Sequence, residues 1–316
     1  MKLQTKIALE SKQHNQIDYN SRLLLIGSCF VENIGNNLEY FKFQNLQNPF
    51  GILFHPIAIE SLITNAINQK EFSEDDVFFQ NEQWHCFNAH SKLSNTNKDT
   101  LLKTLNSQIQ LTAKQLNSSS HIVVTLGTAW LYRFIETDTI VANCHKVPQK
   151  KFLKELLSVD EISESLESIV ALIRSVNSSV SIIFTVSPVR HLKDGFIENT
   201  QSKAHLISAI HQVVEHKKNL HYFPSYEIMM DELRDYRFYA EDMIHPNNIA
   251  VKYIWEKFKE VWINLEAYKT MEEVDVIQKG LQHKPFNPDS EAHNQFIHRL
   301  LERKEKLQSV FPHISF

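Results

Sequence analysis

The segment Arg22-Leu-Leu-Leu-Ile-Gly-Ser-Cys-Phe30 decides the fold, because an apolar run ends there at a glycine and a serine. Residues 23–26 are apolar without interruption, which is typical of a strand buried on both faces of a parallel sheet. Residues 29–40 are predicted as a helix that begins directly after Ser28. A buried strand that leads into a helix is the first half of a βαβ unit, so this segment predicts an α/β fold.

The same alternation continues along the chain. Further strands are predicted at 121–126, 180–186 and 220–224, with an edge strand at 41–45. Further helices are predicted at 99–117, 158–176 and 199–217, and after Pro246, which would take the first helical position. Ser158 and Glu161 form a capping box, which marks one helix start. Strands separated by helices imply right-handed crossovers and a parallel sheet.

Two stretches are interpreted as inserted hairpins, one at 130–143 and one at 77–87. Beyond residue 265 the sequence is charge-rich and helical, with Lys and Glu interleaved. No repeat or Pro/Gly-rich linker interrupts the chain. We therefore expect an α/β domain at residues 1–265 and a helical extension, residues 266–316, packed on it.

Composition excludes several classes of protein. The 316 residues carry a formal net charge of −4, whereas a nucleic-acid binder usually has a basic excess. Three cysteines without a CxxC pair indicate neither a disulfide framework nor a zinc knuckle. No apolar run approaches the ~18 residues of a membrane span, and the first residues contain no apolar signal region. We expect a reduced, cytoplasmic protein.

Glycine is scarce, and its positions are informative. The chain has 6 glycines, and neither a GxGxxG nor a GxxxxGK[ST] motif is present, so no nucleotide cofactor is expected. Gly27 and Gly127 each follow a predicted strand, where the ligand site of a parallel α/β sheet lies. Ser28 then has two interpretations. Its hydroxyl either caps the helix or acts as a nucleophile near the positive helix end.

A nucleophilic serine needs a base, and Asp242-Met-Ile-His245 supplies one candidate. The spacing allows the carboxylate to orient the imidazole, whose other nitrogen would accept the serine proton. Cys29 is an alternative nucleophile, but on a helix its side chain points about 100° away from that of Ser28. The pairs His85-Cys86 and Cys144-His145 lack zinc-ligand spacing, so no metal site is expected.

Several motifs together resemble a known family. A strand–Gly–Ser–helix start and a D-x-x-H before the last core helix resemble the SGNH (GDSL-like) hydrolases, and Gly27-Ser-Cys-Phe30 resembles the GSCFA family within that superfamily. Further segments similar to the family are 48–54, 126–130, 141–146, 185–191 and 223–226. The resemblance implies a flavodoxin-like three-layer α/β/α sandwich with Ser28 as nucleophile and Asp242 and His245 as its partners. No cofactor is expected.

One departure from the superfamily pattern concerns the oxyanion hole. The superfamily has an Asn in a G-x-N-D segment, whereas this chain has Ala129 there. Loss of one such donor typically costs 10²–10³ in rate. The replacement donor is left open among the Ser28 N–H and a set of side chains or backbone groups. That set is Asn48, Gly51, Thr128 and Asn143, and Gly127 is likewise assigned to oxyanion or substrate binding.

Other residues are assigned to substrate binding. Arg190 and His191 follow a predicted strand and are expected to bind an anionic or hydroxyl-rich group. Asn143 and His145 end a predicted hairpin and are expected to fold over the site. The sequence thus favours a serine esterase or deacylase acting on a small acyl ester, such as an acylated sugar. An O-acyltransferase with the same triad and an inactive binding module remain alternatives.

Overall fold

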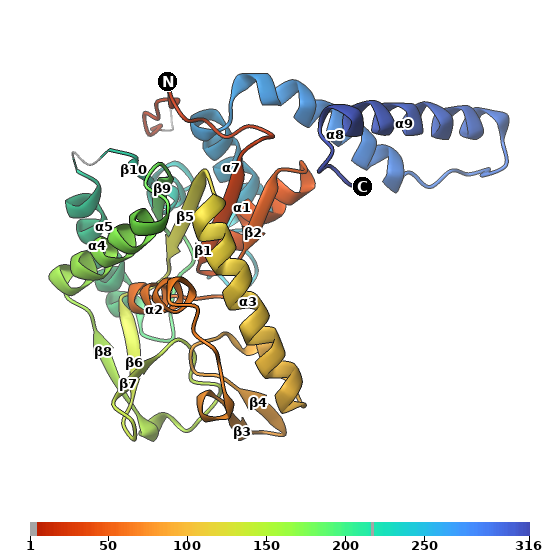
Figure 1. Cartoon of the computed structure of the whole chain (residues 1–316). Coiled ribbons are helices and arrows are strands. Elements are labelled where there is room, and N and C mark those ends of the chain that lie inside the picture. Colours follow the sequence, from red (N-terminus) through yellow and green to blue (C-terminus); the bar gives the residue numbers. More distant parts are fainter. Residues whose placement is uncertain (1–4, 216–217) are drawn as a thin grey trace.

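A parallel sheet of five strands forms the centre of the computed structural model, which describes residues 5–215 and 218–316 (Figure 1). The strands are β1 (Arg22–Gly27), β2 (Gln44–Gln47), β5 (His121–Leu126), β9 (Ser181–Val186) and β10 (Leu220–Phe223). They lie in the order β2-β1-β5-β9-β10, and every neighbouring pair is parallel. Numbered by chain order, this is the 2-1-3-4-5 sequence of flavodoxin-like folds. The predicted fold class is confirmed.

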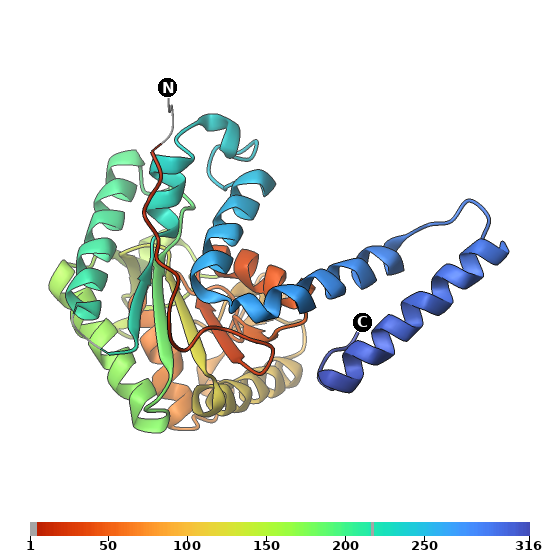
Figure 2. The same ribbon diagram turned by 90° about the horizontal axis from the view of Figure 1, so that it is seen from above.

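Helices cover both faces of the sheet, as Figure 2 shows. Leu24 and Ile26 of β1 point toward four helices, and Leu23 and Leu25 point toward the opposite layer. The first layer contains α2 (Pro56–Ile67), α3 (Lys98–Ser118), α4 (Val159–Val176) and α5 (Phe196–Val214). The second contains α1 (Cys29–Tyr40) and α7 (Asn248–Trp262). Because successive strand residues face opposite layers, a strand buried on both sides must be apolar throughout.

Three boundaries differ from the prediction. The helix predicted at 199–217 begins earlier, at Phe196, and ends at Val214, and its predicted residues 216 and 217 lie outside the described residues. The edge strand begins at Gln44 rather than at residue 41, because the chain leaves α1 through a turn in which Lys42 has φ of 64°. The prediction that Pro246 starts the last core helix is wrong. Pro246 forms a bridge with Tyr239, and the Asn247 side chain caps α7 by accepting the N–H groups of Ile249 and Ala250.

The inserted hairpins are present. One consists of β3 (Phe78–Gln80) and β4 (Gln83–His85). The other consists of β6 (Trp130–Phe134) and β7 (Thr139–Val141), and an additional strand, β8 (Phe152–Leu156), pairs with β6. Helix α2, which begins at Pro56 after a His55 cap, was not predicted. The remaining short elements are α6 (Ser225–Glu227), a π-helix at Ile228–Glu232, and 3₁₀ turns at Glu74–Asp76, Ser91–Leu93, Gln149–Lys151 and Tyr236–Phe238.

The C-terminal arm, residues 265–316, contains α8 (Leu265–Gln282) and α9 (Glu291–Val310) and projects from the α/β body in both views (Figures 1 and 2). Helix α8 is anchored at the C-terminal end of α1. There the Tyr40 hydroxyl donates to Asp275 Oδ1 at 2.8 Å, and Gln278 Nε2 donates to the Tyr40 carbonyl at 3.1 Å. None of the described helices is long and apolar enough to cross a lipid bilayer.

Candidate active site

The predicted nucleophile lies where the strand order reverses. From β1 the chain goes to β2 on one side, and β5 lies on the other side, so the space beyond the ends of β1 and β5 is the usual ligand position. Ser28 follows β1 directly, and Gly127 follows β5 directly. The sheet topology therefore brings these two residues together.

Gly27 makes the turn that places Ser28. Its φ is 139°, a value that residues with side chains rarely adopt, and a Cβ there would lie 2.1 Å from the Thr125 carbonyl oxygen. The close approach allows the Ser28 N–H to donate to that same oxygen at 2.9 Å. The tight turn buries Ser28 completely.

The Ser28 hydroxyl has no hydrogen-bond partner among the residues that the structure describes. Ser28 occupies the N-cap position of α1, but its side chain makes no capping bond, and its Oγ is buried and unbonded. The capping interpretation therefore does not account for this serine. The same observation means that no Ser28–His245 hydrogen bond is formed in this structure.

Two further unbonded polar atoms surround the serine turn. Asn48 Oδ1 accepts the Gly27 N–H at 2.9 Å, which leaves the buried Asn48 Nδ2 without a partner. His191 Nε2 is also buried and unbonded. A Cβ on Gly127 would lie 3.1 Å from Ser28 Cβ and 3.2 Å from His191 Nε2, so both side chains pack against that glycine. Such atoms are uncommon in proteins and therefore call for an explanation.

Several predicted oxyanion donors are already bonded. The N–H groups of Gly127 and Thr128 both donate to the Phe54 carbonyl, at 2.7 and 3.1 Å. The Thr128 hydroxyl contacts the Ser202 hydroxyl at 3.1 Å.

Two more of the predicted donors are bonded as well. The Gly51 N–H donates to the Asn48 carbonyl at 2.7 Å, and the Ser28 N–H donates to Thr125 as described above. Of the predicted donors among the described residues, Asn143 included, the Asn48 side-chain amide is the one whose nitrogen is both buried and without a hydrogen-bond partner.

Asn143 and His145 contact the β3–β4 insertion. His145 Nε2 lies 2.8 Å from the Cys86 carbonyl oxygen, and its ring centroid lies 4.7 Å from that of His85. The Asn143 carboxamide oxygen accepts the His145 N–H at 2.9 Å. Burial lowers the pKa of His145 to about 4, so this imidazole is neutral at physiological pH. These contacts tie both residues to the insertion.

Asp242 and His245 form the predicted pair. His245 Nδ1 lies 2.6 Å from Asp242 Oδ2, and each side chain is about half exposed. Asp242 Oδ1 accepts the backbone N–H groups of Ile244 and His245. Hydrogen bonds from the His245 backbone and side chain, and then from the Ile244 backbone, lower the pKa of Asp242 to about 2. The carboxylate is therefore ionised and holds the imidazole.

The loop of this pair is bonded to the loop that carries the other predicted substrate-binding residues. The Arg190 N–H donates to the Ile244 carbonyl at 3.3 Å. The Arg190 guanidinium lies over the Tyr239 ring, 4.1 Å from its centroid, and 5.7 Å from that of Tyr236. Arg190 lines a hollow of about 290 Å³ next to this loop. The structure thus places His191 on the Ser28 side and Arg190 beside the Asp242–His245 loop.

Lys203 is a site residue that sequence reasoning missed. It lies on α5, is 1% exposed, and its Nζ donates to the carbonyl oxygens of Gly127 and Ser187, both at 2.7 Å. Burial lowers its pKa to about 7. Burial and then the Lys203 charge lower the pKa of His191 to about 3. The available signal was a lysine three residues before the buried Leu206, on the apolar face of the helix.

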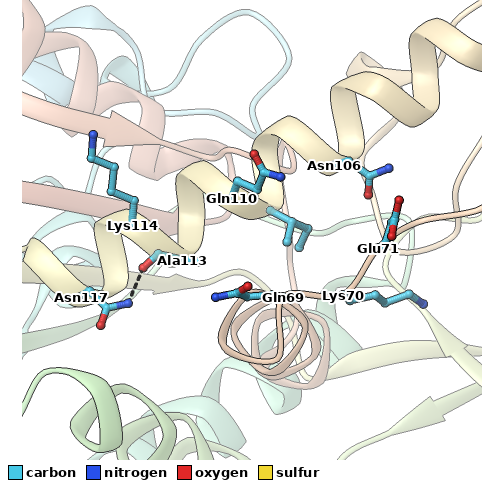
Figure 3. A pocket seen from close by; sticks show the side chains of 9 residues that line it. Gln69, Lys70, Glu71, Asn106, Gln110, Ala113, Lys114 and Asn117 are labelled. Atoms are coloured by element: carbon cyan, nitrogen blue, oxygen red, sulfur yellow. Dashed lines mark hydrogen bonds between the residues drawn. The ribbon is translucent and has the colours of Figure 1, made fainter.

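Two larger hollows lie away from these residues. One of about 580 Å³ runs between the end of α2 and α3, where the side chains of Gln69, Lys70, Gln110 and Lys114 line it (Figure 3). None of its lining residues belongs to the predicted site. Within the part of the chain that the structure describes, no group of three or more His, Cys, Asp or Glu side chains is placed to hold a metal ion.

Comparisons with known proteins address the family. Among solved structures, an acetyl xylan esterase (Est2A) from the rumen bacterium Butyrivibrio proteoclasticus has a TM-score of 0.38 and 10% identity, covering 84% of this chain and 65% of that chain. A comparison with curated proteins finds no match. Residues 274–316 match the GSCFA domain protein, C-terminal domain. Residues 22–258 match the GSCFA family, and the chain belongs to that family.

Proposed function

We propose that the protein is a serine esterase or deacylase in which Ser28 attacks the carbonyl carbon of an acyl ester. The observation that carries this proposal is the convergence of buried, unbonded polar atoms at the serine turn: Ser28 Oγ, Asn48 Nδ2 and His191 Nε2. Leaving such atoms unbonded costs free energy in the absence of a ligand. A polar substrate group bound there would satisfy them.

In the proposed reaction His245 accepts the Ser28 proton while the Asp242 carboxylate fixes the imidazole tautomer. The Asn48 amide donates to the oxyanion of the tetrahedral intermediate and takes the role of the Asn that Ala129 replaces. Collapse of that intermediate, as His245 passes the proton to the departing oxygen, releases the alcohol and leaves an acyl group on Ser28. Water then hydrolyses this ester, with His245 as the base, and regenerates the hydroxyl.

Access to Ser28 requires a rearrangement, because its side chain is fully buried and is not bonded to His245. We assign the movement to the loop that carries Arg190 and His191. This loop joins the Asp242–His245 loop through the Arg190–Ile244 bond, so its displacement also repositions His245. His191 is neutral at physiological pH, and its unbonded Nε2 suits a hydroxyl of the substrate, which agrees with an acylated sugar.

Two alternatives are each favoured by one observation. Full burial of Ser28 excludes water and favours acyl transfer to an acceptor hydroxyl by the same residues. The unformed Ser28–His245 bond favours a binding module without catalysis.

The test uses p-nitrophenyl acetate and a serine-directed fluorophosphonate probe on wild type and Ser28→Ala. Turnover and labelling that disappear in Ser28→Ala support the esterase. Equal labelling of both proteins, or none of either, contradicts it. Release of more p-nitrophenol with an added sugar acceptor, together with an acylated sugar product, indicates the transferase.

A further inference from the structure

Lys203 is a buried ammonium group for which the described residues provide no carboxylate partner. Its Nζ donates to the Gly127 and Ser187 carbonyls, and it lies 5.7 Å from the centroid of the Tyr226 ring. Removal of a charge from water is unfavourable, and carbonyl dipoles and a ring face compensate for it only in part. An apolar residue of similar volume would satisfy the packing of α5 without this cost, so packing alone does not explain a lysine here.

The two carbonyls belong to the turns that border the candidate active site. Gly127 follows β5 and Ser187 follows β9, and the Ser187 N–H donates to the Leu126 carbonyl at 2.8 Å. Lys203 therefore crosslinks the ends of two adjacent strands from the helix layer. The Ser187 turn leads through Val189 into the loop that bears His191.

The crosslink reaches Ser28 through Gly127. The α-carbon of this glycine packs against the Ser28 and His191 side chains, as shown by the 3.1 and 3.2 Å distances from its ideal Cβ position. A shift of the Gly127 peptide would alter the spacing of these side chains. Misplacement by about 1 Å at an active site costs on the order of 10²-fold in rate.

We propose that Lys203 is a positioning residue of the esterase site, which holds the Gly127 and Ser187 carbonyls so that Gly127 and the His191 loop keep their places against Ser28. This proposal rests on the proposed function, and it names a residue that does not touch the substrate.

The titratable groups that face Lys203 are Cys29 on α1, His191 on its loop and Tyr226 on α6. Burial raises the pKa values of Cys29 and Tyr226, so both are neutral at physiological pH. The Lys203 charge lowers the pKa of His191, in addition to the effect of burial. The His191 imidazole therefore reports on the Lys203 charge without any need for catalysis.

The test compares Lys203→Met with Gln201→Met, which places the same residue at an exposed position of the same helix. For Lys203→Met we expect kcat on p-nitrophenyl acetate to fall about 100-fold, as when a site donor is lost, with KM little changed. We expect the His191 pKa, measured by imidazole NMR, to rise. The unfolding midpoint should not fall, because an uncompensated buried charge is removed. Gln201→Met should leave kcat, the His191 pKa and the unfolding midpoint unchanged.

Equal kcat and equal His191 pKa in the two variants would overturn the proposal. If Lys203→Met does not fold, Lys203→Gln, which keeps N–H donors but no charge, must still raise the His191 pKa. An inactive wild type in which Lys203→Met raises the His191 pKa would refute the esterase but support the placement of Lys203. If the wild type is active and the His191 pKa is unchanged in both Lys203 variants, the positioning role of Lys203 is refuted and the esterase proposal is not affected.

Discussion

Ser28 is the residue at which the structural and catalytic interpretations give opposite predictions. A serine that caps a helix stabilises it, and its replacement by Ala typically costs 0.5–2 kcal/mol. The Ser28 hydroxyl makes no such bond, and it is buried without a partner in the described part of the chain. Its removal therefore eliminates an unsatisfied polar group and no stabilising interaction.

We predict that Ser28→Ala lowers esterase turnover by at least ~10³-fold, the scale seen when a triad member is removed. We also predict that its free energy of unfolding is equal to or above that of wild type. Urea unfolding and p-nitrophenyl acetate hydrolysis measure the two quantities. A loss of stability with activity retained would show that Ser28 serves only the helix.

His245 and His191 are expected to differ in their roles. His245 is oriented by a carboxylate, whereas no carboxylate of residues 5–215 and 218–316 bonds to His191, which is neutral at physiological pH. We predict that His245→Ala lowers kcat by at least ~10³-fold. His191→Ala should instead raise KM for an acylated sugar more than it lowers kcat. The opposite pattern in steady-state kinetics would make His191 the base.

Lys203 also makes stability depend on pH. Its pKa is lowered in the folded protein to about 7, so between that pH and the ordinary lysine pKa of about 10.4 the unfolded chain binds more protons. Stability contributed through this residue therefore rises with pH across that window. We predict that the difference in unfolding free energy, wild type minus Lys203→Met, increases from pH 7 to pH 10. A pH-independent difference in urea titrations would contradict the lowered pKa.

The proposed site residues that were predicted from the sequence carry local motifs, whereas Lys203, whose proposed role depends on tertiary packing, was not predicted. Ser28 follows a strand–glycine signal, and Asp242 and His245 are three residues apart, so both motifs are local. Lys203 acts on carbonyls that are 76 and 16 residues away in the chain. The choice of Asn48 among several possible donors required knowledge of which N–H groups were already bonded.

At the scale of elements, two strand-to-loop turns use glycine for different reasons. Gly27 has a backbone conformation that residues with side chains rarely adopt. At Gly127, a side chain would crowd the side chains of Ser28 and His191. We predict that Gly27→Ala destabilises the protein by more than about 4 kcal/mol, which is typical only of severe strain or clash. Gly127→Ala should cost about 1–3 kcal/mol from overpacking but lower kcat about 100-fold. Thermal unfolding and steady-state kinetics distinguish the two variants. Similar losses of stability and of kcat in both would contradict the different roles given to the two glycines.

Helix α7 and the Asp242–His245 loop are joined through Asn247. Its Oδ1 accepts two α7 N–H groups, while its Nδ2 donates to the Arg237 carbonyl at 2.7 Å. We predict that Asn247→Asp keeps the cap and most of the stability but lowers kcat, because the donor to Arg237 is lost. Asn247→Ala should lose both the α7 cap and the bond to Arg237, and the lost cap should lower stability by about 1 kcal/mol. Equal kcat values for wild type and Asn247→Asp would show that the loop does not need this bond.

The buried strands were predictable because each is a continuous apolar run, and periodicity also gave most helices. The capping box at Ser158 and Glu161 is present as predicted. Elements without a distinctive sequence pattern were not predicted, or were predicted to start at the wrong residue. Helix α2 depends on a His55 cap, and β8 is recognised only by its pairing with β6. Asn247 provides the α7 cap, so Pro246 does not begin that helix.

At the scale of the whole molecule, α1 separates the candidate active site from the C-terminal arm. Ser28 stands at the beginning of this 12-residue helix, and Tyr40 at its end contacts Asp275 of the arm. At 1.5 Å per residue, the helix holds these two points about 18 Å apart. The arm is therefore positioned to affect the fold of the body at α1 more directly than the chemistry at Ser28.

The connection between α8 and α9 offers a test with the intact chain. Phe286 in this connection is fully exposed, and α9 packs on α8 through Leu300, whose side chain occupies the space beside Gly280. We predict that brief chymotrypsin treatment cuts after Phe286 and leaves p-nitrophenyl acetate hydrolysis within about 2-fold of the uncut protein, since surface changes remote from a site have small effects. A Phe286→Ser variant controls for cleavage elsewhere. Activity that declines in step with cleavage at Phe286 would show that the arm supports the catalytic site.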